Sequence, residues 1–489
     1  MTSIQRIKIS RRYLKSRWKH FLSLNKKGVL LIEGVSTEDL RKKYGTPLYV
    51  LVEAEVRKRL REFKNAFDYP LFKPQYACKV NSNLEILRIV REEGFDCDAS
   101  SVGEIILGLL ADFEPNQITF TNLYKTTQDI LFAANIGVRS ITIDSLEEID
   151  KAIEVGSKLR KTIPVLIRVN PMIKDGRFST KNQQYGIPFA YAKRAISKIN
   201  ASEFVDLKGF HFHGSYAYST KGYFLAIKKL MRLVQFSAAQ GVKIDTIDLG
   251  GGFPPEAPRY LRPGKYFPPA KLGEKFIPFF QNLFEQAELN KPTLIFEPGK
   301  FIVATSGIGL FEVVSKKKLG KKEILVTNSS CYSMFPDILI SKAKYELLPA
   351  QDMLVRRLRR YDVVGCTCDC LDVISRNEFM PLMYPKDLIA VMDCGAYSYV
   401  MASNFNNLKR PPMILIRPDG TTKMIRRRDR YSDMFAPELD VLKVADPAEL
   451  KKLYNISRVS LNKVWGAKSN GTTEESNGED SNGKESNSI

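Results

Sequence analysis

Short β-rich runs alternate with segments whose apolar residues recur every three or four positions, and this alternation restricts the possible folds most strongly. The first five runs begin roughly 20–25 residues apart, which is the length of a strand–helix unit. Eight such units in series predict an α/β fold with a parallel (β/α)8 barrel, and a doubly wound sheet is the alternative. The eight runs are 75–81, 95–100, 118–122, 140–144, 165–171, 207–215, 244–251 and 293–299.

The pattern changes after residue 305, where β-rich runs follow one another without long helical segments between them. We therefore expect a barrel domain over 37–305 and a second, mostly antiparallel β domain over 306–466. The early runs at 28–34 and 46–52 are candidates to join the second domain. The later runs are 323–329, 361–368, 387–395, 411–420 and 422–428.

The two ends of the chain differ from its middle. Residues 1–36 form a basic extension, in which nine Lys and Arg precede the first acidic residue, Glu33. Leu14, Trp18, Phe21 and Leu22 have the spacing of one helix face, so we expect a helix there. It would pack on the body, act as a transit peptide, or contact a membrane or nucleic acid. Residues 467–489 are polar with very few apolar side chains, which predicts a disordered tail.

Composition narrows the class of protein. Apolar residues make up 44% of the 489, enough for a large core, and the formal net charge is +21. The seven cysteines are too few for a disulfide scaffold, and their odd number favours a reducing compartment. No uninterrupted apolar stretch has the length of a membrane span. We expect a cytoplasmic location, with organelle targeting by residues 1–30 left open.

Unusual polar residues fall at the ends of four predicted barrel strands. Lys79 ends the first strand, His211 and His213 the sixth, Gly250–Gly252 the seventh and Glu297–Lys300 the eighth. In parallel barrels the active site lies at the carboxyl ends of the strands. The sequence therefore predicts one site at this end of the barrel.

Each of these residues has a chemical and a structural interpretation. Burial would favour a neutral, nucleophilic Lys79 that forms a Schiff base, whereas the alternative is a salt-bridged lysine. The glycines at 250–252 let backbone N–H groups approach a phosphate, or they form a tight turn. Glu297 would hold a protonated ring nitrogen, or it pairs with a nearby lysine.

The histidines and a cysteine cluster leave more alternatives open. His211 and His213 would be metal ligands, stack on a cofactor ring, or be satisfied core residues. Cys366, Cys368 and Cys370 alternate along a β-rich run. They would bind zinc, supply a thiol proton donor, or be buried structural cysteines.

Taken together, these motifs resemble the pyridoxal-phosphate-dependent barrel (fold type III) amino acid decarboxylases. The resemblance runs from about residue 45 to about residue 416 and is closest to diaminopimelate decarboxylase. The resembling segments are YACKVNSNLEILR (76–88), DASSVGE (98–104), HFHGS (211–215), DLGGGFP (248–254), EPGK (297–300), GCTCDCLD (365–372) and GAYSYVMASNFN (395–406).

The resemblance implies a role for each candidate residue. Lys79 is the lysine that binds pyridoxal phosphate, His213 stacks on its ring and Glu297 pairs with its nitrogen. Tyr397 and Lys300 contact cofactor and substrate. The remaining cofactor-binding positions are Ser215, Gly250, Gly251, Gly252 and Gly299. No metal is expected.

The loop over 365–372 is implied to reach a partner subunit's site in a homodimer. There Cys368 would be the proton donor, and Asp369 would bind the distal amine of the substrate. The implied reaction is decarboxylation of an amino acid with a distal amine, most simply meso-diaminopimelate to lysine. Ornithine- or lysine-type decarboxylation, racemisation and a non-catalytic regulatory role are the alternatives.

Departures from the family pattern keep those alternatives open. Lys300 replaces the usual arginine and loses its bidentate fork. The segment before Ser215 is one residue short. Asp369 is ornithine-like, where diaminopimelate enzymes carry a glutamate, and Leu339 lies near the position of an expected substrate-binding tyrosine.

Overall fold

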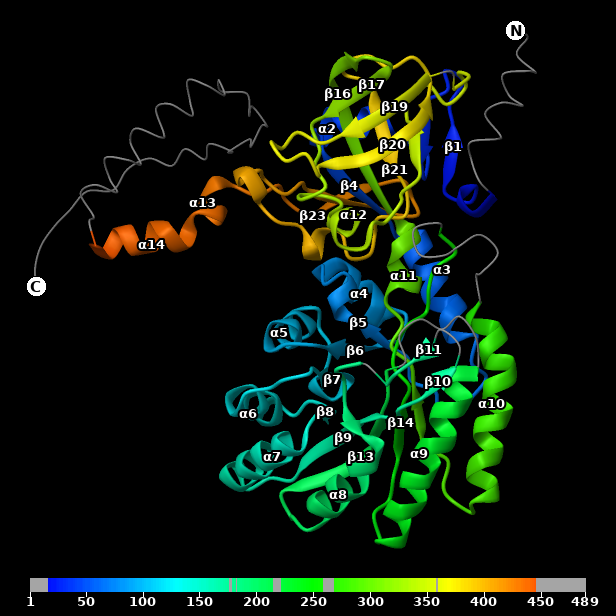
Figure 1. The fold of residues 1–489 in the computed structure, drawn as a ribbon, viewed down its shortest axis with the longest axis vertical. Helices are drawn as coiled ribbons and strands as arrows, with labels where there is room; N and C mark the ends of the chain where they lie inside the picture. The colour runs from blue at the N-terminus through cyan, green and yellow to red at the C-terminus, as the bar shows by residue number, and fades with distance from the viewer. Residues whose placement is uncertain are drawn as a thin grey trace, which may run out of the picture. The chain divides into compact units, whose positions relative to one another are not determined.

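The computed structural model describes residues 16–175, 178–181, 183–213, 221–257, 268–357 and 359–445. The chain divides into two compact units between Asp429 and Arg430. The second unit contains, in its described part, α13 (Tyr431–Met434) and α14 (Ala436–Ala445). All predicted site residues belong to the first unit, whose elements are labelled in Figure 1.

Eight parallel strands form the predicted barrel, in the order β15-β14-β13-β9-β8-β7-β6-β5. The ends of this sheet meet, because the N–H of Gln75 donates to the carbonyl of Phe296 at 2.9 Å. Both faces of most of these strands are buried, as expected for the wall of a filled barrel. The parallel barrel is thus confirmed over the doubly wound sheet. Its strands are β5 (Gln75–Ala77), β6 (Asp96–Ala99), β7 (Ile118–Thr121), β8 (Ser140–Ile143), β9 (Ile163–Asn170), β13 (Val205–His211), β14 (Thr246–Asp248) and β15 (Thr293–Ile295).

Helices follow the strands on the outside of the barrel (Figure 1). Several begin at a side-chain cap, since Asn83, Ser101 and Ser145 each accept a hydrogen bond from the backbone of the first helical turn. The three caps fix the first residues of α4, α5 and α7. Each of these helices therefore begins a few residues after the preceding barrel strand ends. The helices are α3 (Glu53–Lys64), α4 (Leu84–Glu92), α5 (Val102–Leu110), α6 (Thr127–Ile136), α7 (Leu146–Leu159), α8 (Phe189–Asn200), α9 (Lys221–Ala239), α10 (Pro269–Gln286) and α11 (Lys300–Val303).

A second, mostly antiparallel sheet has the order β20-β19-β17-β16-β4-β22-β23, and β21 pairs with β16 and β18. Only the pairs β17–β19 and β4–β22 are parallel. The early run at 46–52 supplies β4 to this sheet, whereas β16, β18 and β20 were not predicted. The strands are β4 (Leu48–Val52), β16 (Gly307–Leu319), β17 (Lys322–Thr327), β18 (Leu347–Pro349), β19 (Arg359–Val364), β20 (Val373–Met380), β21 (Leu388–Val391), β22 (Met413–Ile416) and β23 (Thr422–Arg426).

Smaller elements complete the described chain. The helices α2 (Thr37–Tyr44) and α12 (Pro336–Ser341) accompany the second sheet. Short strands β10 (Lys174–Asp175) and β11 (Phe178–Ser179) form a separate pair, and β12 (Ile187–Pro188) pairs with β9. No helix of the described residues has both the length and the apolar character that crossing a membrane requires.

The N-terminal segment corrects one prediction. Where a helix was expected, the described residues form a 3-10 turn, η1 (Ser16–Trp18), and the strand β1 (Leu22–Leu24). With β2 (Leu30–Ile32) and β3 (Val35–Ser36), β1 makes a small antiparallel sheet, so the run at 28–34 does not join the second sheet. Trp18, Phe21 and Leu22 are buried in a common apolar cluster with residues of β4 and β16, so this part packs on the body. Leu14 and the predicted disordered tail lie outside the described residues.

Candidate active site

One cavity of about 500 Å³ brings most of the predicted site residues together at the carboxyl ends of the barrel strands. The predicted residues that line it are Lys79, His213, Gly251, Gly252, Glu297, Gly299, Lys300 and Tyr397. Gly250 lies in the same loop, one residue from the lining. Ser215 lies outside the described residues.

Lys79 was predicted at the end of a strand. It lies instead in the 3-10 turn η2 (Cys78–Val80) that follows β5. Its Nζ atom lies 3.1 Å from Oδ2 of Asp98, whose side chain is fully buried at the end of β6. This turn places Lys79 in the lining of the cavity.

The charge state of Lys79 differs from the sequence-based expectation. Burial lowers its pKa, but the nearby carboxylates of Asp98 and Glu297 outweigh burial, so the pKa lies above its usual value. The salt-bridged lysine, which was the structural alternative, is therefore what this structure contains. The amine must lose a proton before it can attack a carbonyl carbon.

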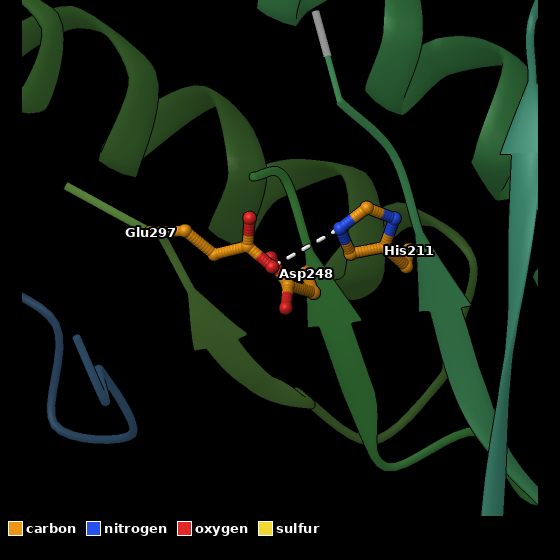
Figure 2. A group of neighbouring side chains, drawn as sticks. All are labelled: His211, Asp248 and Glu297. Carbon is orange, nitrogen blue, oxygen red and sulfur yellow. Dashed lines mark hydrogen bonds and ion pairs between the residues drawn. The ribbon is translucent and has the colours of Figure 1, made fainter. Parts of the chain in front are cut away.

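Three side chains converge where β13, β14 and β15 end (Figure 2). Nε2 of His211 lies 3.1 Å from Oε1 of Glu297, and ligand atoms of both residues lie within 4.8 Å of an Asp248 oxygen. Burial, reinforced by the Arg168 charge, holds the pKa of His211 well below its usual range. The imidazole is therefore neutral and donates its Nε2–H to Glu297.

Asp248 is held in its protonated form. Burial and the like charge of Glu297 raise the pKa of Asp248 well above its usual value. Its Oδ1 atom accepts the N–H of Gly250 at 2.8 Å. The group therefore places Glu297 beside two neutral side chains, His211 and Asp248, and on the wall of the cavity, which suits a cationic ring nitrogen.

The glycine loop passes very close to its neighbours. Gly250 and Gly252 have positive φ angles of 66° and 106°, which favour glycine. A Cβ atom on Gly251 would lie 2.5 Å from the carbonyl oxygen of Glu297. Only residues without side chains allow the loop to pass between the ends of β13 and β15.

His213 lies beside this loop and lines the cavity. Its Nδ1 atom accepts the N–H of Gly251 at 3.3 Å. Burial, against the opposing effect of Glu297, lowers the pKa of His213 to about 3. The ring is therefore neutral, which suits stacking against an aromatic ligand better than pairing with a charge.

Tyr397 and Lys300 complete the cavity on the side of the second sheet. The N–H of Tyr397 donates to the carbonyl of Val80 at 3.0 Å, beside Lys79. Nζ of Lys300 lies 5.3 Å from the centre of the Tyr397 ring. Lys79 and Tyr397 also line a second cavity of about 360 Å³, together with Glu104 and Arg410.

Cys368 and Asp369 are not among the residues that line either cavity. Cys368 is exposed, and its Sγ atom lies 3.4 Å from Nδ2 of Asn406. Asp369 accepts a hydrogen bond from the Tyr332 hydroxyl, which raises the pKa of Tyr332 to about 12. Cys366 and Cys370 are exposed as well, so the buried structural interpretation of this cluster is wrong.

Several residues of the site, among them Asp98, Asp248, Arg168 and Tyr185, were not assigned a role from the sequence. Arg168 is a charged residue in the apolar strand β9, a signal that could have identified it, whereas Asp98 lies in β6 beside a second aspartate, Asp96. Arg168 lies 3.1 Å from Asp144 and 4.4 Å above the Tyr185 ring. Tyr185 lines the main cavity from a loop, where no sequence pattern marks it.

Comparison with known proteins agrees with this geometry. Residues 53–304 match the family model described as "Pyridoxal-dependent decarboxylase, pyridoxal binding domain". Diaminopimelate decarboxylase of Methanothermobacter thermautotrophicus is 30% identical over 84% of this chain and 96% of its own length. The Staphylococcus aureus enzyme of the same name is 28% identical over 83% of this chain and 96% of its own length. The structure of M. jannaschii diaminopimelate decarboxylase in complex with L-lysine has a TM-score of 0.79 and 26% identity, covering 85% of this chain and 97% of the other. The chain therefore belongs to the pyridoxal-dependent decarboxylase family.

Proposed function

We propose that this protein is a pyridoxal-phosphate-dependent decarboxylase that converts meso-diaminopimelate to lysine. The observation that carries the proposal is the meeting of Lys79, Glu297 and the glycine loop around one cavity. The two enzymes of Methanothermobacter thermautotrophicus and Staphylococcus aureus support the substrate, because both carry the name diaminopimelate decarboxylase.

The residues of the cavity fit the cofactor. Lys79 offers a primary amine to an aldehyde, Glu297 a carboxylate to a ring nitrogen, and Gly251 and Gly252 lie where a phosphate needs close backbone approach. Among the described residues, Asp98 Oδ1, on the side chain that pairs with Lys79, is buried without a hydrogen-bond partner, as expected where a polar ligand belongs. When bound, pyridoxal phosphate supplies the electron-withdrawing ring that accepts the electron pair left by the departing carboxylate.

The side chains of this chain control the protons around that chemistry. Asp98 lies close enough to Lys79 to take the ammonium proton, and burial together with Glu297 raises the pKa of Asp98, which makes it a stronger base. Glu297, supported by neutral His211, would keep a ring nitrogen charged. His213 would hold the ring in place, and Lys300 with Tyr397 would bind anionic groups of cofactor or substrate.

The described residues that line the cavity include no cysteine thiol to serve as the proton donor. Cys368 is exposed on the second sheet's side and is not part of the cavity lining. We propose that a second copy of the chain supplies Cys368 as the proton donor and Asp369 as the partner of the distal amine. The protein would then be a homodimer with shared sites.

A shorter diamino acid is the second candidate substrate. Asp369 is one methylene shorter than the glutamate of diaminopimelate enzymes, and Leu339 in α12 offers no polar group to a distal carboxylate. These two positions favour ornithine or lysine. We also propose a cytoplasmic location, since all seven cysteines are free thiols.

The test combines cofactor trapping with a substrate screen. Purified protein with pyridoxal phosphate should develop an imine absorbance, and borohydride should fix the cofactor on Lys79 as located by peptide mass spectrometry. Carbon dioxide release is then measured with diaminopimelate, ornithine, lysine, arginine and carboxylated polyamine precursors. The Lys79→Ala variant is the control.

Each alternative gives a different result. No adduct on Lys79 contradicts the cofactor assignment. An adduct without turnover of any amino acid indicates a regulatory homologue, and loss of optical rotation without carbon dioxide indicates a racemase. Release from ornithine or lysine alone supports the second candidate substrate.

A further inference from the structure

The N-terminal segment, which precedes the matched family domain, reaches two segments that carry site residues. Nη2 of Arg17 lies 2.6 Å from Oδ2 of Asp393 and 2.6 Å from Oε2 of Glu346. Its other terminal nitrogen, Nη1, donates to the carbonyl of Glu256. The Trp18 Nε1–H points to the second oxygen of Asp393, at 3.4 Å.

The contact with Asp393 connects Arg17 to the turn that carries Tyr397. Asp393 is 2% exposed and begins the turn 393–397, in which Gly395 donates to the carbonyl of Ala304 at 3.0 Å. Asn81 donates to the carbonyl of Gly395 at 3.0 Å, and Tyr397 donates to Val80. The turn is therefore attached at one end to Arg17 and at the other to the segment that carries Lys79.

The contact with the carbonyl of Glu256 connects Arg17 to the segment that follows the glycine loop. Glu256 follows Gly250–Gly252 in a segment whose Phe253 and Ala257 are buried. The Arg17 guanidinium thus connects the end of this segment with the Asp393 turn. A planar guanidinium with several N–H donors can join acceptors that lie in different directions, which a lysine ammonium does less rigidly.

We propose that Arg17 and Trp18 are positioning residues that fix the 393–397 turn relative to the glycine-loop segment, and so hold Tyr397 over the cofactor cavity. This inference rests on the proposed function, because it assumes that Tyr397 and the loop bind cofactor and substrate together. Displacement of a site residue by a fraction of an ångström to one ångström is enough to weaken binding and catalysis measurably.

The experiment compares Arg17→Gln with Arg57→Gln. Arg57 also joins three carboxylates, those of Glu53, Glu92 and Glu93, but it does so away from the cavity. Both variants should lower the thermal unfolding midpoint. Only Arg17→Gln should raise the dissociation constant for pyridoxal phosphate, measured by absorbance titration, and the KM, each by on the order of tenfold. Arg17→Lys should restore part of the loss, and Trp18→Phe should cause a smaller loss of the same kind.

A double-variant comparison tests the route through Tyr397. If Arg17 acts by placing Tyr397, Arg17→Gln should have little further effect on cofactor affinity in the Tyr397→Phe background. Additive losses, or an Arg17→Gln variant with the affinity and KM of Arg57→Gln, would overturn the inference. Failure of the unmodified protein to bind pyridoxal phosphate would instead contradict the proposed function.

Discussion

Asp98 holds the amine of Lys79 in its charged form, with its Oδ2 atom 3.1 Å from Nζ. Burial lowers the pKa of Lys79, but the Asp98 and Glu297 carboxylates outweigh burial and raise this pKa above its usual value. A bound aldehyde would need this proton removed, and the buried carboxylate next to it is the nearest acceptor. Asp98 therefore contributes, together with Glu297, to the pH at which Lys79 becomes reactive.

Replacement of Asp98 by asparagine should shift cofactor capture to lower pH. The carboxylate raises the pKa of Lys79, so its removal lets burial lower that pKa and increases the neutral amine at a given pH by on the order of tenfold. The measurement is imine absorbance after mixing with pyridoxal phosphate, followed against pH. Asp96→Asn is the control, because Asp96 lies in the same strand but pairs with Arg139. An unchanged pH profile in Asp98→Asn would show that this pair does not control the amine.

Replacement of Glu297 by glutamine should impair turnover more than attachment of the cofactor. The variant keeps the shape of the side chain but loses the charge that a protonated ring nitrogen requires, so kcat should fall about 10²–10³-fold. Borohydride should still trap the cofactor on Lys79. Asp245→Asn, which removes a carboxylate just before β14 at the other end of the strands, should leave kcat unchanged. A kcat equal to that of the unmodified enzyme would refute the assignment of Glu297.

Glu55 should make stability depend on acid pH. Burial raises the pKa of this carboxyl, but the His20 hydrogen bond and the Arg59 charge outweigh burial and lower it to about 2. Because the folded pKa lies below the unfolded value of 4.5, its stabilising contribution is present above pH 4.5 and is lost as pH falls toward 2. Glu55→Gln should therefore lower the free energy of unfolding by about 3 kcal/mol at neutral pH.

The difference between Glu55→Gln and the unmodified protein should disappear as the pH approaches 2. Urea unfolding between pH 2 and pH 7 measures both free energies. Glu62→Gln on the same helix is the control, since its carboxylate is 39% exposed and should change stability little. A constant difference across this pH range would mean that Glu55 is not the titrating group.

Replacement of Gly395 by alanine should lower both the free energy of unfolding and the affinity for pyridoxal phosphate. A Cβ atom there would lie 1.8 Å from the carbonyl oxygen of Val303, so the backbone must move, at a cost of about 1–3 kcal/mol. Because Tyr397 follows in the same turn, affinity for pyridoxal phosphate should fall as well. Gly103→Ala in α5, where the nearest atom would be 3.6 Å away, should be neutral or stabilising in the same unfolding assay. Equal unfolding free energies for the two variants would contradict this packing argument.

Local sequence patterns predicted the elements whose structure depends mainly on their own residues. All eight barrel strands were predicted, because most are short apolar runs between turn signals. The predicted runs at 75–81, 244–251 and 293–299 extend past β5, β14 and β15, whose last residues are Ala77, Asp248 and Ile295. The helix expected near Trp18 was wrong because the spacing of Leu14, Trp18, Phe21 and Leu22 fits a helix face as well as a buried turn followed by a strand. β20 was missed because four consecutive polar residues, 375–378, interrupt its apolar pattern, and the strand is defined by its pairing with β19.

The barrel, the family and most residues of the cavity could be predicted from the sequence, since they depend on local apolar patterns and on motifs of contiguous residues. The charge on Lys79, the neutral forms of His211 and Asp248, and the position of Cys368 outside the cavity of its own chain became evident from the folded arrangement. Protonation depends on burial and on charges from strands far apart in sequence, which no local pattern contains. Such distances are set when the strands close into a ring and the second sheet brings Tyr397 beside Val80.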